Sequence, residues 1–293
     1  MSAENKIPTR RERARGGAEK LFTRTFSGLL YAFLTVLFLF LGTIPTAIAF
    51  AAMSWLCCSE FFRISRQMGR TPNEFLGLTA TVIFVILPLW EPQFDLFPFV
   101  LALLILLSGI WYVWRPRASI GDAAITLFAP LYTGFMMSPI VSIRHMHYET
   151  IDYFWIWSML LAFGVVASVW ASDALAYFVG SKFGSLKMTP KISPNKTWEG
   201  FFGGMLGSVF IWILMWFIGI PGFSLPLAVI GGISVGFAGV MGDLFESRLK
   251  RAAGVKDAGA FIPGHGGMLD RSDSLLFAYF VAYFVLLLAG FVV

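Results

Sequence analysis

Long apolar runs alternate with short polar segments along the whole chain. A helix needs about 20 predominantly apolar residues to cross the hydrocarbon core of a bilayer. By this criterion the pattern predicts nine membrane helices, over residues 25–42, 44–62, 74–91, 94–114, 121–143, 153–180, 200–220, 225–248 and 273–293. The sequence therefore predicts an all-α, polytopic membrane protein. Eight crossings are the alternative, because the turns near residues 42 and 91 are short.

The basic residues test this count independently. Lys and Arg accumulate in the cytoplasmic loops of membrane proteins. With the N-terminus inside, 21 of the 22 Lys and Arg residues fall in segments predicted to be cytoplasmic, and only Arg144 does not. This distribution favours nine helices, a cytoplasmic N-terminus and a C-terminus on the other side.

Composition agrees with a membrane location, and it argues against nucleic-acid binding and against sites built on cysteine. The 293 residues are 57% hydrophobic and 13% charged, whereas soluble domains are about 25% charged. The net charge of +5 does not indicate a nucleic-acid partner, because the basic residues form no continuous stripe on a soluble domain. Cys57 and Cys58 are adjacent in an apolar run, so neither a disulfide framework nor a CxxC metal site is expected.

The same pattern divides the chain into three parts. Residues 1–24 are predicted to form a basic cytoplasmic tail, residues 25–150 five membrane helices, and residues 151–293 a C-terminal region of four membrane helices. Two cytoplasmic loops of the last part, 182–199 and 249–272, are rich in Gly, Pro, Lys and Asp. Each follows a helix that carries acidic residues, and we expect the chemistry there.

Acidic residues lie on two of the C-terminal helices. Asp173 is inside a predicted crossing, where an ionisable group costs about 2.5–3.5 kcal/mol on insertion scales and usually marks a site. Asp243 and Glu246 share one helix face, and cations follow them. Carboxylate oxygens suit magnesium, which in turn bridges phosphate oxygens. The alternatives are that Asp173 only caps or hydrogen-bonds a neighbouring helix and that Glu246 belongs to an interfacial ion-pair lattice.

The loop after the eighth predicted helix reads KDAGAFIPGHGGMLDRSDS. Gly266 and Gly267 allow the backbone to approach a ligand closely, and successive amides in such a turn can bind an anion. The charged and polar residues around them are Lys256, Asp257, His265, Asp270, Arg271 and Asp273. A plain glycine turn is the alternative, and the surrounding acids and bases favour a site.

The loop between the sixth and seventh predicted helices reads GSKFGSLKMTPKISPNKTWEG. Its Ser-Pro-Asn-Lys-Thr run places Lys196 between the hydroxyls of Ser193 and Thr197. A lysine charge with directional hydroxyl bonds suits a phosphate monoester at the membrane surface. Taken singly, such lysines are more often topology signals.

These residues resemble a known family. Residues 247–274, SRLKRAAGVKDAGAFIPGHGGMLDRSDS, are similar to the signature of the phosphatidate cytidylyltransferases, and the upstream stretches SDALAYFVGSKFG and ISPNKTWEG resemble the family as well. The similarity covers roughly residues 165–293. The first half resembles the family only as a run of membrane helices.

The resemblance implies a homodimeric, all-helical enzyme of the bacterial inner membrane, with its site facing the cytoplasm. Such an enzyme uses magnesium, with a second cation left open, to transfer CMP from CTP to phosphatidic acid. The residues that it implies as catalytic are Asp243, Asp270, Lys256, His265 and Arg271. Those for substrate binding are Ser193, Lys196, Thr197, Lys250, Arg251, Gly266 and Gly267. As metal ligands it favours Asp243 and Asp270, followed by Asp173, Asp257, Asp273 and Glu246.

Two other functions remain open at this point. A CTP-dependent polyprenol or lipid kinase has a similar C-terminal region but would release CDP. A lipid transporter would use its intramembrane acids for ion coupling, yet the acids here adjoin a cytoplasmic phosphate-binding segment. The kinase predicts CDP as the product, and the transporter predicts acids along a path across the whole bilayer.

Overall fold

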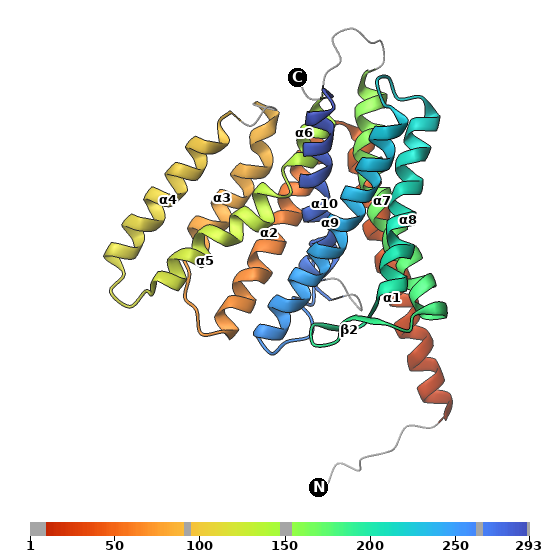
Figure 1. Cartoon of the computed structure of the whole chain (residues 1–293). Coiled ribbons are helices and arrows are strands. Elements are labelled where there is room, and N and C mark those ends of the chain that lie inside the picture. The colour runs from red at the N-terminus through yellow and green to blue at the C-terminus, as the bar shows by residue number, and fades with distance from the viewer. Residues whose placement is uncertain (1–9, 91–94, 147–153, 262–265, 292–293) are drawn as a thin grey trace.

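The structure is a computed structural model that describes residues 10–90, 95–146, 154–261 and 266–291. Within these ranges, nine helical segments run back and forth between two ends of the molecule (Figure 1). The first group is α1 (Arg10–Leu41), α2 (Thr43–Gln67), α3 (Glu74–Ile86) continued by η1 (Leu87–Leu89), α4 (Phe97–Trp114), and α5 (Ile120–Pro130) continued by η2 (Leu131–Phe135) and α6 (Pro139–His145). The second group is α7 (Phe154–Phe183), a hairpin of β1 (Lys187–Thr189) and β2 (Ser193–Thr197), α8 (Trp198–Ile218), α9 (Leu225–Ala252) and α10 (Leu269–Leu288).

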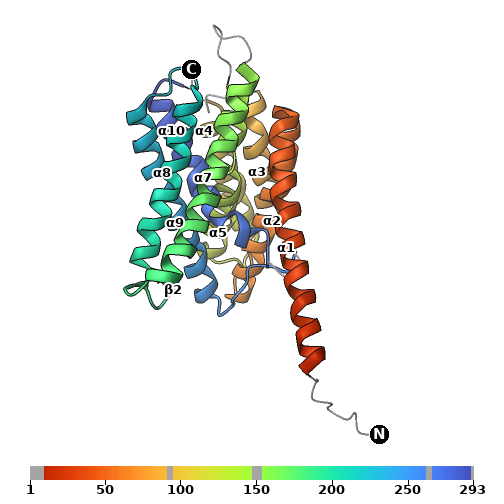
Figure 2. The ribbon, with the colours of Figure 1, turned by 90° about the vertical axis from the view of Figure 1, so that its right-hand side faces the viewer.

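The prediction of a polytopic helical membrane protein is confirmed. Seven of the described helical segments are long and apolar enough to cross a membrane, and two shorter apolar helices, Thr25–Leu41 and Glu74–Leu89, complete the set. Each of the nine predicted crossings corresponds to one of these segments. In Figures 1 and 2 the N-terminal end of α1 extends beyond the body at the end that carries the hairpin, and the C-terminus lies at the opposite end.

The structure corrects three details of the predicted pattern. The fifth crossing is interrupted after Pro130 by one turn of π-helix, a type of irregularity that often occurs at functional sites. The predicted loop 182–199 contains an antiparallel hairpin. The predicted loop 249–272 is shorter, because α9 continues to Ala252 and α10 begins at Leu269. Asp270 and Arg271 therefore lie on a helix, where an acid in the first turn is favourable.

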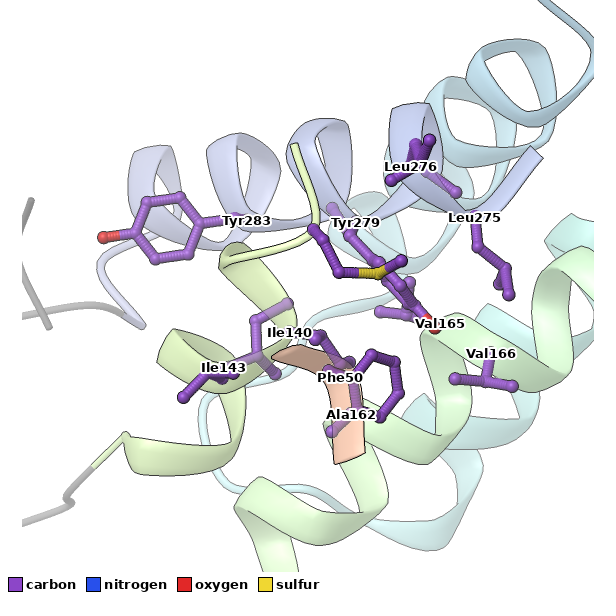
Figure 3. Close-up of a cluster of buried hydrophobic side chains, with 14 of the residues drawn as sticks. Phe50, Ile140, Ile143, Ala162, Val165, Val166, Leu275, Leu276, Tyr279 and Tyr283 are labelled. Atoms are coloured by element: carbon purple, nitrogen blue, oxygen red, sulfur yellow. The ribbon is translucent and has the colours of Figure 1, made fainter. Parts of the chain in front are cut away.

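The core lies where α2, α6, α7 and α10 meet (Figure 3). There Phe50 of α2 contacts Tyr279 of α10 edge to face, with 5.9 Å between ring centroids. Ile140 of α6 and Val165 of α7 are buried in the same cluster. The early helix α2 is thus packed directly against the last helix of the chain.

Small residues bring α7 and α8 into backbone contact. A methyl group at Gly207 would lie 2.6 Å from the carbonyl oxygen of Ala171, and one at Gly200 would lie 2.9 Å from that of Ala176. In a bilayer, close packing of this kind is a main source of helix association. Asp173 lies on α7 and the hairpin directly precedes α8. The packing of α7 against α8 therefore fixes the position of the hairpin relative to Asp173.

Arg144 has a structural role at the end of the molecule opposite the hairpin. It is buried, and its guanidinium donates to the carbonyl oxygen of Leu39 at 2.9 Å and to the hydroxyl of Ser158 at 3.1 Å. These bonds join α6 to α1 and α7. The one basic residue that departs from the predicted charge asymmetry is therefore an internal connector.

We predict that Gly207→Ala weakens the α7–α8 contact, because the added methyl group would collide with backbone that cannot move away. The free energy of unfolding in detergent should fall by about 1–3 kcal/mol, as for other overpacked cores. Thermal unfolding of the purified protein measures this. The matched control is Gly109→Ala on α4, where a methyl group meets nothing within 4 Å; equal losses for both variants would contradict the prediction.

Candidate active site

Carboxylates and cations from several elements meet at the end of the molecule that carries the hairpin. At the centre is Lys250 of α9, whose ammonium lies 2.5 Å from an oxygen of Glu246 and 2.6 Å from Oδ1 of Asp270. Glu246 has no solvent exposure. A buried carboxylate is tolerated only with a partner, so Lys250 neutralises Glu246 and links α9 to α10.

Asp270 also orders the backbone between these two helices. Its Oδ2 accepts hydrogen bonds from the amides of Ala258 at 2.9 Å and Gly267 at 2.7 Å. One carboxylate thus joins both sides of the α9–α10 connection. The Gly267 amide, which the sequence suggested for an anionic ligand, here binds a carboxylate of the protein itself.

A second charge pair links the hairpin to α9. Lys196 of β2 lies 2.8 Å from Oδ2 of Asp243, and the hydroxyl of Ser247 donates to Oδ1 at 3.1 Å. Asp243 and Lys196 keep 34% and 24% of their side-chain surface exposed, which leaves both able to reach a ligand. Thr197 next to Lys196 accepts a hydrogen bond from the Gly200 amide and caps α8.

Two further carboxylates interact electrostatically with Asp243. Asp173 of α7 is exposed and lies within electrostatic range of Asp243, Lys196 and Arg271. Asp273 of α10 is buried, and it interacts electrostatically with Asp243 and Asp173. The structure therefore brings together the intramembrane acids from α7, α9 and α10 that the sequence indicated separately.

An aromatic layer borders these charges. Tyr132 of η2 is 2% exposed and lies 4.9 Å from the ring of Phe245, with Phe61 and Phe277 at 5.9 and 6.2 Å. Its hydroxyl is within electrostatic range of Asp273 and other site acids. The interrupted fifth crossing thus places a tyrosine against the charged cluster and packs α2, α9 and α10 together there.

Other predicted site residues lie at the margin of the cluster. Lys256 and Asp257 are exposed on the α9–α10 connection, Arg271 is exposed on the first turn of α10, and Ser193 is half-buried in β2. Arg251 donates to the carbonyl oxygens of Ile192 and Val255 at 3.4 and 3.2 Å. Gly266 adopts a left-handed conformation, with φ +86°, and His265 lies outside the described residues.

Sequence reasoning missed Glu60 and Arg63 of α2. Glu60 accepts hydrogen bonds from the amides of Met268 and Leu269 at 3.1 and 2.8 Å, and Arg63 donates to the carbonyl oxygen of Ala258. A signal was present, because Glu60 is the only acid in the second apolar run. The rule on intramembrane acids that identified Asp173 applies equally to Glu60.

The donor chemistry of the cluster suits a hard divalent cation, which prefers carboxylate oxygens. In the part of the chain that the structure describes, however, no group of three or more His, Cys, Asp or Glu side chains stands ready to hold a metal ion. Asp243 fits best, since it is partly exposed and has Asp173 and Asp273 as neighbours. Both oxygens of Asp270 are already used, so a cation there would have to replace Lys250.

The comparisons with known proteins identify the family. The family model for the cytidylyltransferases matches residues 22–289. This chain belongs to the cytidylyltransferase family. The match extends the similarity over the N-terminal helices, where the sequence showed only a run of apolar segments.

Phosphatidate cytidylyltransferases of several organisms are similar to this cytidylyltransferase-family chain, two of them over most of its length. It is 31% identical over 289 residues to a phosphatidate cytidylyltransferase of Synechocystis sp., a match that covers 90% of this chain and 96% of the relative. It is 30% identical over 277 residues to that of Bacillus subtilis, with 90% and 97% covered. A phosphatidate cytidylyltransferase of Thermotoga maritima is 44% identical over 130 residues, 41% of this chain and 47% of the relative.

The buried charge pair generates a prediction about stability. Lys250→Met keeps much of the side-chain volume but leaves Glu246 without its cation. Breaking one partner of a buried pair typically costs about 3–5 kcal/mol. Thermal unfolding in detergent should therefore show a large loss for Lys250→Met and almost none for Arg248→Met, an exposed residue on the same helix. Similar stability of the two variants would show that Lys250 does not neutralise a buried carboxylate.

Proposed function

We propose that this membrane protein transfers CMP from CTP to phosphatidic acid, giving CDP-diacylglycerol and pyrophosphate. The observation that carries the proposal is its similarity to phosphatidate cytidylyltransferases over 90% of the chain. The site supports it, because alternating carboxylates and lysines at a membrane surface suit an anionic lipid and a polyphosphate.

In this reaction a phosphate oxygen of phosphatidic acid attacks the α-phosphorus of CTP, the bond to the β-phosphate breaks, and pyrophosphate leaves. The attacking phosphate is anionic at neutral pH, so the protein has to position two anions and neutralise their charge rather than supply a strong base. Preorganised cations in a site of low dielectric are well suited to that task.

The proposed roles follow the position of each residue. Lys196 and Ser193, with Thr197 behind them, contact the lipid phosphate from the hairpin that precedes α8. The triphosphate is held from the α9–α10 side, with the amides of Gly266 and Gly267 nearby. The side chains proposed for it are Lys250, Arg251, Lys256, His265 and Arg271. Lys196 and Lys250 are paired with Asp243 and Asp270, so each lysine can turn to a phosphate when its carboxylate takes another partner.

For magnesium we propose Asp243 and Asp270 as the first ligands, with Asp173, Asp257, Asp273 and Glu246 as further candidates. A bound divalent cation would neutralise phosphate charge and orient the triphosphate. Glu246 is the weakest of these, because it is fully buried against Lys250. A second cation stays a prediction.

We further propose a homodimer in the cytoplasmic membrane of a bacterium, with the site facing the cytoplasm. The division into a basic tail (1–24), a first half (25–150) and a catalytic region (151–293) also stays a proposal. Contacts of α2 with the α9–α10 connection support a site that draws on both halves.

Product identification tests the function directly. Purified protein is incubated with CTP labelled in the cytosine ring, phosphatidic acid and magnesium, and the products are separated. The proposal requires label in CDP-diacylglycerol and release of pyrophosphate. Labelled CDP together with a phosphorylated lipid would instead establish a lipid kinase, and the absence of any CTP turnover would leave the transporter alternative.

Substitution of two lysines should change the KM values of the two substrates differently. Lys196→Ala should raise the KM for phosphatidic acid several-fold with a smaller effect on CTP, whereas Lys256→Ala should do the reverse, since each lysine binds its own substrate. Both KM values are measured in detergent micelles at fixed lipid surface concentration. A raised KM for CTP alone in Lys196→Ala would contradict this division of the site.

The proposed orientation predicts a labelling pattern. Single cysteines at Lys191 and Ala260, both exposed at the site end, should react with a membrane-impermeant maleimide only from the cytoplasmic side. A cysteine at Ser224, between α8 and α9 at the other end, should react only from outside. The native Cys57 and Cys58 are buried and give little background. Labelling of positions 191 and 260 from opposite sides would rule out a shared site.

A further inference from the structure

The start of α10 is completed by a residue from α2. Met268 at the N-cap forms no side-chain cap bond among the described residues, and the first amides of a helix need acceptors. The amides of Met268 and Leu269 donate to the two oxygens of Glu60, which lies 208 and 209 residues earlier in the chain. The carboxylate also lies at the favourable, positive end of the helix dipole.

Glu60 is buried at this place. Its residue surface is 8% exposed, and a carboxylate buried in a membrane helix is costly unless it is bonded. A neutral polar residue on α10 itself could cap the helix at lower cost. An acid supplied by a distant helix therefore indicates a function beyond local capping.

Two glycines of the α9–α10 connection close around the Glu60 carboxylate. A methyl group at Gly259 would lie 1.9 Å from Oε1, and one at Gly267 would lie 2.3 Å from Oε2. Both glycines are described, and neither has a positive φ, unlike Gly266. Space for Glu60, rather than backbone conformation, is thus what these two positions require.

The segment that closes around Glu60 also holds Asp270. Gly267 donates its amide to Asp270, and Ala258 donates its amide to Asp270 while its carbonyl accepts from Arg63. We propose that Glu60 is a positioning residue, which fixes Gly259, Gly267 and the first turn of α10 so that Asp270 and the triphosphate-binding residues are aligned. The inference rests on the proposed function, and it makes the N-terminal half part of the active site.

Glu60→Gln tests the proposal with little change in volume. The amide group of glutamine replaces one of the two acceptor oxygens, so one helix amide loses its partner. We expect kcat to fall at least tenfold and the KM for CTP to rise at least threefold. The KM for phosphatidic acid should stay within twofold, because Lys196 does not contact Glu60. The control is Glu74→Gln, a partly exposed acid paired with Arg66 outside the site, which should match the wild type.

These readouts distinguish positioning from a merely structural role. A variant that only folds poorly lowers the amount of active protein, and therefore kcat, but leaves both KM values unchanged. That result, or wild-type kinetics in Glu60→Gln, would overturn the proposal. Wild-type protein assayed beside the variants shows separately whether CDP-diacylglycerol is made at all.

A double-mutant cycle approaches the same contact from the other side. Gly267→Ala should collide with Glu60 and give the same signature, a raised KM for CTP with an unchanged KM for phosphatidic acid. Glu60→Asp shortens the acid by one methylene group and makes room for the new methyl group. The double variant should therefore be no less active than Gly267→Ala alone, whereas multiplied losses would show that the two residues act independently.

Discussion

Asp270 lies in the first turn of α10, and its carboxylate meets a lysine of α9 and two backbone amides of the connection that precedes it. Inside a membrane protein none of these groups can be left without a partner at low cost. The end of α9, the start of α10, Ala258 and Gly267 of the connection, and the buried Glu246 are therefore all held by one set of contacts. These contacts order the backbone around Asp270 without a bound substrate, and preorganised polar groups are what electrostatic catalysis needs.

The remaining elements support that arrangement from outside. The glycine contacts between α7 and α8 hold the hairpin so that Lys196 reaches Asp243. On the opposite flank, the π-turn after Pro130 places Tyr132 among aromatic rings of α2, α9 and α10. The charged cluster is thus bordered by the tightly packed α7–α8 pair and by a layer of large apolar side chains, and it keeps an exposed face.

The apolar pattern was sufficient to predict the order of the nine helical segments in the described part of the chain, seven of which are long enough to cross a membrane, because about 20 apolar residues per crossing is a strong physical requirement. The Asp243 and Glu246 spacing correctly indicated a shared helix face, and the Glu246–Lys250 pair was readable as an i, i+4 contact. The partners of Asp243 and Asp270 were not predictable, since Lys196 and Ala258 reach them only through tertiary structure. Glu60 was overlooked because an apolar run is read as a membrane span, and one acid near its end changes that pattern little.

The bond between Glu60 and the start of α10 also has a consequence for biogenesis. A nascent chain inserts its helices from the N-terminus onward, so α2 enters the bilayer while α10 has not yet been synthesised. Until then the Glu60 carboxylate lacks the two amides that satisfy it in the finished protein, and water or a chaperoning surface has to solvate it. Arrival of the last helix supplies these two amides and Asp270 together, so a chain that ends before α10 lacks both the partners of Glu60 and part of the reaction centre.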